Sequence, residues 1–84
     1  MDDIHPEDKG IDKIPGQIIS VRGSVVDIEF PENLPPIQSL IRCGEDDGVQ
    51  IEVAAHLDEQ RVRGIALNAT AGLYRGAPAW TYGD

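Results

Sequence analysis

The sequence predicts an all-β fold, a small six-stranded antiparallel closed β-barrel with a flexible N-terminal arm. Three observations lead to this prediction. Short apolar runs rich in β-branched residues recur along the chain, and some alternate strictly between apolar and polar side chains. Turn residues separate these runs at intervals of about 8–12 residues, as in small barrels. Glycines also lie within the runs, where they allow a small sheet to bend and close.

The arm is predicted to comprise residues 1–15, and the barrel domain residues 16–84. Residues 1–15 hold both lysines of the chain and five of its acidic residues, with few and irregularly spaced apolar side chains. Such a composition buries too little apolar surface to offset the entropy lost on ordering. We therefore expect the folded part to start after Pro15.

Residues 16–30 are expected to form the first two strands, with a turn or bend at Gly23, since glycine tolerates the backbone angles required. From residue 24 onward the side chains alternate between two faces of the predicted strand. One face carries Val26, Ile28 and Phe30, and the other carries Val25, Asp27 and Glu29.

Residues 31–36 connect to a third strand at 37–43, in which Leu40 and Ile41 are the best core candidates. Asp47-Gly48 between two apolar runs is a strong hairpin signal. The next strand, residues 49–57, has the clearest alternation in the chain. The face predicted to be buried carries Val49, Ile51, Val53, Ala55 and Leu57.

The fifth strand is expected at residues 61–67. Its apolar phase changes, with Val62 on one parity and Ile65 on the other, so we expect a β-bulge at Gly64. A loop at 68–76 leads to a last strand at 77–82, which Pro78 should confine to an edge.

Length and composition limit the number of domains, the partners and the cellular compartment that the chain can have. Eighty-four residues make one domain, and a net charge of −8 argues against nucleic acid and anionic membrane surfaces as partners. The same charge is compatible with a basic protein partner. The single cysteine, Cys43, forms no internal disulfide and favours a reducing, cytosolic compartment. We find neither a membrane-spanning apolar run nor a signal peptide.

Residues for catalysis or metal binding are scattered. No lysine follows Lys13, so a phosphate-binding loop is absent. His5, Cys43 and His56 are scattered and lack metal-ligand spacing. Ser20, His56 and Asp27 have no nucleophile elbow to support a triad. The acidic turn at 45–47 lacks the spacing of a calcium loop, and the aromatic residues lack the basic groove of an oligonucleotide site. We therefore expect no catalytic, nucleotide-binding or metal-binding residue and no cofactor in this chain.

The stretch GQIISVRGSVVDIEFPENLPPI, residues 16–37, resembles the opening of the β subunit of F-type ATP synthase. In that family an apolar strand lies between two glycines, here Gly16 and Gly23. The patterns V-V-D-[IV]-x-F and L-P-P-I follow, here at residues 25–30 and 34–37.

A second stretch, IEVAAHLDEQRVRGIALNATAGLYRG, resembles a later signature of the same family. Its parts are E-V-A-x-H-L at 52–57, V-R-x-I-A-L at 62–67 and T-x-G-L-x-R-G at 70–76. Arg22 and Ser24 stand where main-line β subunits more often have Gly-Pro. RGSVVD at 22–27, together with LDEQRVRGIAL at 57–67, is similar to the alternate, sodium-associated ATPase group of bacteria and archaea.

The resemblance implies the N-terminal barrel of a longer subunit, cut before its nucleotide domain. In the family, such barrels hold three α and three β subunits together in a ring. The implied parent is an ion-transporting ATP synthase or ATPase, whose ATP or ADP and Mg bind beyond residue 84. It would be cytoplasmic and peripheral to the inner or plasma membrane, as part of the F1 sector, without direct membrane contact.

The implied partners are the α subunits and the chain's own nucleotide domain. The candidate inter-subunit contacts are outward polar residues: Arg22, Asp27, Asp58, Glu59, Gln60, Arg61 and Arg63. We also expect weak self-association of the isolated chain through residues 77–82, where Trp80 and Tyr82 would meet the next domain. The alternative hypothesis is a freestanding acidic β-barrel, an adaptor that binds a basic protein.

Overall fold

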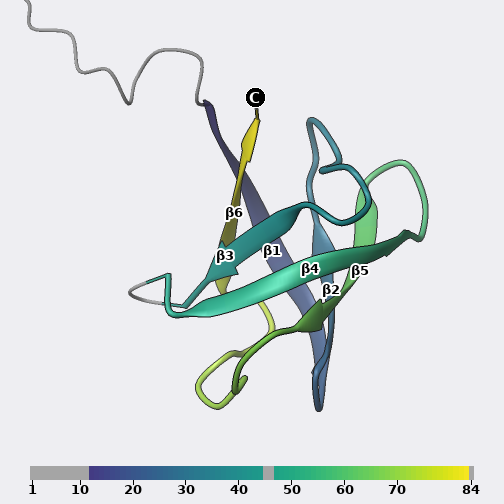
Figure 1. Ribbon diagram of the computed structural model, residues 1–84. Coiled ribbons are helices and arrows are strands. Elements are labelled where there is room, and N and C mark those ends of the chain that lie inside the picture. The colour runs from purple at the N-terminus through teal and green to yellow at the C-terminus, as the bar shows by residue number, and fades with distance from the viewer. Residues whose placement is uncertain (1–11, 45–46, 84) are drawn as a thin grey trace, which may run out of the picture.

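The computed structural model describes residues 12–44 and 47–83, which form strands and connections without a helix (Figure 1). The strands are β1 (Asp12–Arg22), β2 (Val25–Glu29), β3 (Leu40–Cys43), β4 (Val49–His56), β5 (Arg61–Ala66) and β6 (Pro78–Gly83). They pair antiparallel in the closed order β1-β2-β5-β4-β3-β6. The predicted fold class, a closed six-stranded antiparallel barrel, is therefore confirmed. None of the described residues forms a helix with the length and apolar character needed to cross a membrane.

Apolar side chains fill the interior of the barrel. The core consists of Ile18, Val26, Ile28, Phe30, Ile41, Cys43, Val49, Ile51, Val53, Val62, Ala77 and Ala79. The alternation in residues 24–30 predicted the buried face correctly, because Val26, Ile28 and Phe30 all lie in this core. The predicted turn is also present: Arg22 pairs with Val25, and Gly23 between them has a φ of 61°.

The strand β1 starts earlier than the composition suggested. It begins at Asp12, and its first residues pair with β6, Lys13 opposite Tyr82 and Pro15 opposite Trp80. Pro15 is tolerated because β2 pairs with β1 only from Gln17 onward, so this half of β1 has one neighbour. The rest of the predicted arm, residues 1–11, lies outside the described residues.

The last strand is not at an edge, so that prediction was wrong. In the closed barrel β6 lies between β3 and β1. Pro78 is the first residue of β6 and pairs only with Gln17, whereas β3 reaches only as far as Ala79. A proline at the first position of a strand interrupts little of the hydrogen-bond ladder, which is why an interior strand accepts it here.

The hairpin predicted at Asp47-Gly48 joins β3 to β4, with Cys43 opposite Val49. Asp47 has a φ of 54°, a left-handed conformation that aspartate tolerates better than most residues. Of the two core candidates in β3, Ile41 is buried but Leu40 points outward, since neighbouring residues of a strand face opposite sides.

The predicted bulge lies on the strand opposite Gly64. The β4–β5 register shifts between Val53 and Ala55, whereas β5 pairs regularly with β2. This extra residue reverses the alternation in β4, so Leu57 is exposed rather than buried as predicted. Gly64 is needed for close approach instead, because a Cβ there would clash with Ile51 and lie 2.9 Å from the Glu52 carbonyl oxygen.

Candidate interaction surface

The predicted contact residues fall into two groups on the outside of the barrel. Arg22, Asp27 and Arg63 gather where β1, β2 and β5 lie side by side, since the register places Asp27 opposite both Ser20 and Arg63. The turn residues 58–60 and Arg61 form the second group, between β4 and β5.

Asp27 is the centre of the first group. It alternates with the buried residues of β2 and therefore points outward, where Arg63 binds it with two hydrogen bonds. Arg63 Nε donates to Oδ1 at 2.9 Å and Nη2 donates to Oδ2 at 3.0 Å. Ser20 Oγ donates to Oδ2 at 3.4 Å, and Arg22 Nη2 lies 3.8 Å from the same oxygen. These contacts tie three adjacent strands together.

The charges in this group are unequally available to a partner. Hydrogen bonds from Arg63 lower the pKa of Asp27, although burial of the carboxylate opposes this effect, and the same bonds raise the pKa of Arg63. The Asp27 side chain is 12% exposed and that of Arg22 65% exposed. Asp27 and Arg63 thus satisfy each other, and Arg22 is the most exposed charge of the group.

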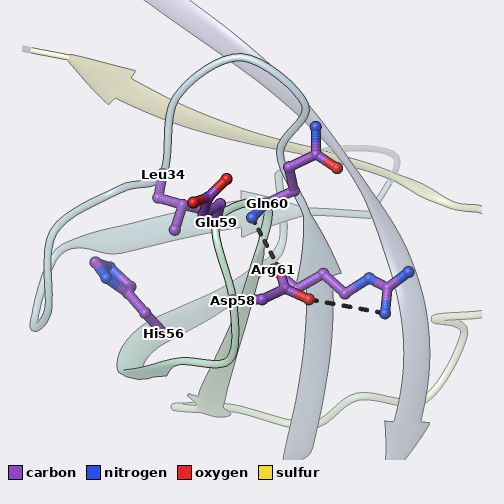
Figure 2. A pocket seen from close by; sticks show the side chains of 6 residues that line it. All are labelled: Leu34, His56, Asp58, Glu59, Gln60 and Arg61. Atoms are coloured by element: carbon purple, nitrogen blue, oxygen red, sulfur yellow. Dashed lines mark hydrogen bonds and ion pairs between the residues drawn. The ribbon is translucent and has the colours of Figure 1, made fainter.

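The second group surrounds a shallow hollow of about 720 Å³ (Figure 2). Leu34 and His56 line it together with residues 58–61. Asp58 accepts a hydrogen bond from the Gln60 backbone N–H at 2.8 Å, and its Oδ2 lies 3.9 Å from Arg61 Nη1. Both interactions are drawn in Figure 2. Because the Asp58–Arg61 pair is half exposed, it stabilises the barrel little and its charges face solvent.

The scattered chemical groups that the structure describes do not come together into a reactive site, and His5 lies outside the described residues. His56 Nε2 lies 2.7 Å from the Pro35 carbonyl oxygen, and Ser20 bonds Asp27 instead of a histidine. Cys43 is in the core, where burial raises the pKa of its thiol to about 11. Within residues 12–44 and 47–83, no three His, Cys, Asp or Glu side chains are placed to share a metal ion. Of the acidic turn at 45–47, only Asp47 is described.

The aromatic residues expected to pack in the core or at an interface differ in their surroundings. Phe30 is buried, whereas Tyr74 is exposed. Trp80 is half-buried, and the Lys13 ammonium nitrogen lies 4.1 Å from the centroid of its ring. Tyr82, on the same strand, is exposed.

Sequence reasoning missed two features of the outer surface. It did not identify Ser20 as a partner of Asp27, because the bulge between Ile18 and Ser20 in β1 decides which residue lies there. It treated Leu40 as a core candidate and left the inward face of the fifth strand open between Val62 and Ile65, yet Leu40 and Ile65 both point outward. For Ile65 a signal existed, since Gly64 and Val62 share the opposite parity and mark the inward face of β5.

A family profile and individual relatives both match this chain, and all of them are from ATP synthase. The profile for the ATP synthase alpha/beta family, beta-barrel domain, matches residues 18–79. The chain is 56% identical over 66 residues to ATP synthase subunit beta 1 of Marinomonas sp. (strain MWYL1), covering 73% of this chain and 14% of that protein. It is 57% identical over 61 residues to ATP synthase subunit beta 2 of Shewanella frigidimarina (strain NCIMB 400), covering 73% and 13%.

A third relative matches along the entire chain. ATP synthase subunit beta 1 of Chlorobaculum tepidum (strain ATCC 49652 / DSM 12025 / NBRC 103806 / TLS) is 43% identical over 84 residues, which are 100% of this chain and 16% of that protein. The chain thus spans 13 to 16% of the length of these three relatives. The alternative of a freestanding adaptor barrel finds no support among these matches. Profile, relatives and closed barrel agree that the chain belongs to the ATP synthase alpha/beta family, in which it is the N-terminal beta-barrel domain of the beta-subunit type.

Proposed function

We propose that this barrel is a non-catalytic contact module in an α3β3 ring of an ion-transporting ATP synthase or ATPase. The observation that carries the proposal is the closure of the barrel, in which each strand pairs with a neighbour on both sides. Closure makes the module stiff, because every strand has a partner on both sides along at least part of its length and none is an edge strand at which a sheet would deform or add strands. A ring of stiff modules provides fixed pivots, while hinges elsewhere in the subunits absorb motion.

The barrel does not fit a nucleotide or Mg²⁺ site, which we assign to other parts of a full-length subunit. Lys13, after which no lysine follows, lies against Trp80, and the buried carboxylate of Asp27 is held by Arg63. Among the described residues, Lys13 is not part of a phosphate-binding loop and Asp27 is not part of a group of three potential metal ligands.

The ring contacts are proposed to use the accessible charges of the two groups described above. These are Arg22 in the first group and Arg61 with residues 58–60 in the second. Asp27 and Arg63 contribute indirectly, by fixing the strands that carry these charges. This division changes the experiment that tests the contacts, because reversing the charge of Arg63 would also leave Asp27 without its main partner.

The remaining features of the proposal come from the family resemblance. Partners are the α subunits and the nucleotide domain of the same subunit, in an F1 sector at the cytoplasmic face of the inner or plasma membrane. The barrel itself makes no membrane contact. The resemblance to the alternate, sodium-associated group is carried by RGSVVD at residues 22–27 and LDEQRVRGIAL at residues 57–67. For the isolated chain, the exposed ring of Tyr82 supports weak self-association through residues 77–82.

To test the proposal, the protein encoded by the gene of this chain is expressed with a purification tag, together with an α-type subunit. Assembly is then measured by size-exclusion chromatography and native mass spectrometry. We expect a complex with equal numbers of the two proteins. Arg61→Glu should weaken assembly without changing the melting temperature, because its pair with Asp58 is exposed. Arg75→Glu, the same charge change on the exposed 68–76 loop, is the matched control. Purification of the wild-type protein without the α-type subunit would contradict the proposal.

A further inference from the structure

The outer wall of the barrel carries an apolar patch with one carboxylate at its centre. We call it the outer apolar patch; it consists of Ile37, Leu40, Ala54 and Ile65 around Glu52. Ile37 is 48% exposed and Leu40 and Ile65 are each 41% exposed, although all three are large aliphatic side chains. Except for Leu40, these residues line a hollow of about 280 Å³.

The strand register builds the centre of the patch. Glu52 on β4 pairs with Leu40 on β3 and with Ile65 on β5, so the carboxylate lies between two aliphatic side chains. Cross-strand partners of this kind are about 5 Å apart at their Cβ atoms and share one face of the sheet. The bulge in β4 also brings Ala54, which is exposed, to the rim of the hollow.

A turn holds Ile37 at the same hollow. The Ser39 backbone N–H donates to the Pro36 carbonyl oxygen at 3.1 Å, which places Ile37 and Gln38 at the centre of a four-residue turn. Gln38 has a φ of 76°, a conformation that costs a residue with a side chain free energy. Its N–H donates to the Val53 carbonyl oxygen at 2.8 Å, which ties the turn to β4. Ile37 is therefore held in place before any partner binds.

Glu52 differs from Asp27, another outward carboxylate of the barrel wall. Asp27 is bound by Arg63 and Ser20, whereas Glu52 forms no ion pair or side-chain hydrogen bond with another described residue. A carboxylate covered by a partner's apolar surface would lose its hydration without compensation. A surface that covers this patch must therefore supply a cation for Glu52.

We propose that the outer apolar patch is a docking surface for a neighbouring subunit, which presents a Lys or Arg to Glu52 from among aliphatic side chains. This inference rests on the proposed ring function and names a contact surface and its chemistry. A second copy of this chain does not fit. A two-fold contact through the patch would bring two Glu52 carboxylates together, between chains that each carry a net charge of −8.

The position of the patch also suits a ring. In the closed order β1-β2-β5-β4-β3-β6, β4 is three strands from β1 in either direction, so these strands lie on opposite walls. Each subunit of a ring contacts one neighbour on either side. In a head-to-tail ring the two contacts use different surfaces of the subunit, so it needs two contact surfaces. The patch is centred on β4, whereas Arg22 is on β1.

The first test compares two charge reversals in the assembly experiment described above. Glu52→Lys should weaken binding to the α-type subunit about tenfold or more, because it places like charges together in a desolvated contact. Glu32→Lys makes the same change in net charge on the exposed β2–β3 connector and should leave binding unchanged. Melting temperatures of both variants identify any effect on folding. Equal binding by the two variants, or equal loss, would overturn the inference.

The second test identifies the occupant without changing any charge. A photoreactive benzoylphenylalanine at position 65 should crosslink to the α-type subunit, at a segment that contains a Lys or Arg. The same group at position 17, which is exposed on the opposite wall, should not crosslink to that segment. Crosslinking at position 65 to a second copy of this chain would overturn the choice of occupant. The wild-type chain could assemble while Glu52→Lys binds as well as Glu32→Lys and position 65 gives no crosslink to the α-type subunit. In that case only this inference fails. Failure of wild-type assembly would instead contradict the proposed ring function.

Discussion

Replacement of Asp27 by asparagine tests whether the charge group on β1, β2 and β5 stabilises the barrel. Asp27→Asn keeps the size and shape of the side chain but removes the charge that Arg63 binds at 2.9 and 3.0 Å. An amide presents one oxygen and one NH₂ group, so one of the two hydrogen bonds from Arg63 is replaced by two donors that face each other.

The expected loss follows from the exposure of the two partners. Hydrogen bonds to charged groups contribute about 1.5–3 kcal/mol when buried, and exposed ion pairs about 0–1 kcal/mol. The Asp27 side chain is 12% exposed and the Arg63 side chain 40% exposed, so the pair falls between these limits. We expect Asp27→Asn to lower the free energy of unfolding by about 1–2 kcal/mol. In a domain of this size that corresponds to a fall of roughly 5–10 °C in melting temperature.

The effect of Asp27→Asn should depend on pH in a defined direction. The folded-state pKa of Asp27 lies below its ordinary value of 3.8, so ionisation of this group stabilises the folded state above that pH. This contribution is lost as the pH falls through the lowered pKa. The difference in unfolding free energy between wild type and variant should therefore be constant from about pH 7 to 5. It should become smaller as the pH falls below about 4.

The assay is thermal unfolding followed by circular dichroism between pH 2.5 and 7. Glu32→Gln is the matched control, because it converts an exposed carboxylate to an amide with the same change in net charge. If Asp27→Asn melts within about 1 °C of this control at pH 7, the ion pair does not stabilise the barrel. A difference that persists unchanged at pH 2.5 would show that charge is not its cause.

Two further predictions concern the core. Gly64→Ala should lower the free energy of unfolding by about 1–3 kcal/mol in urea titration, because the new methyl group clashes with Ile51 and approaches the Glu52 carbonyl oxygen. Gly48→Ala, which meets nothing within 4 Å, is its control, and equal stability of the two variants would contradict the assigned close approach. Cys43, whose thiol pKa is raised to about 11, should react with a disulfide reagent at pH 7.5 at least roughly 100-fold more slowly than in guanidinium. Rapid reaction in native buffer would show that the barrel opens readily at this strand.

Predictions from the sequence were most accurate for features that depend only on neighbouring residues, such as the alternation of side chains along one strand. Val26, Ile28 and Phe30 were assigned to the core by period alone, and the Asp47-Gly48 hairpin by turn chemistry alone. Both signals act over a few residues, so the rest of the chain does not alter them. The family assignment also came from the sequence, because its two signatures lie in short continuous stretches.

Predictions from the sequence failed where pairing with a second strand determines the bounds of a strand or the direction of a side chain. The start of β1 at Asp12 depends on pairing with β6, more than sixty residues later in the sequence. The orientation of Leu57 depends on a bulge set by the close approach of β4 to Gly64. No local pattern contains these contacts.

The sequence by itself thus determined that the chain is an acidic, all-β member of its family. Only the tertiary structure decided which of its outward residues are available to a partner. Asp27 and Arg63, 36 residues apart, neutralise each other, while Glu52 is left between Leu40 and Ile65 without a described partner. The physical reason is that alternation determines which residues share a face along one strand. Barrel closure and cross-strand register determine which residues of different strands meet.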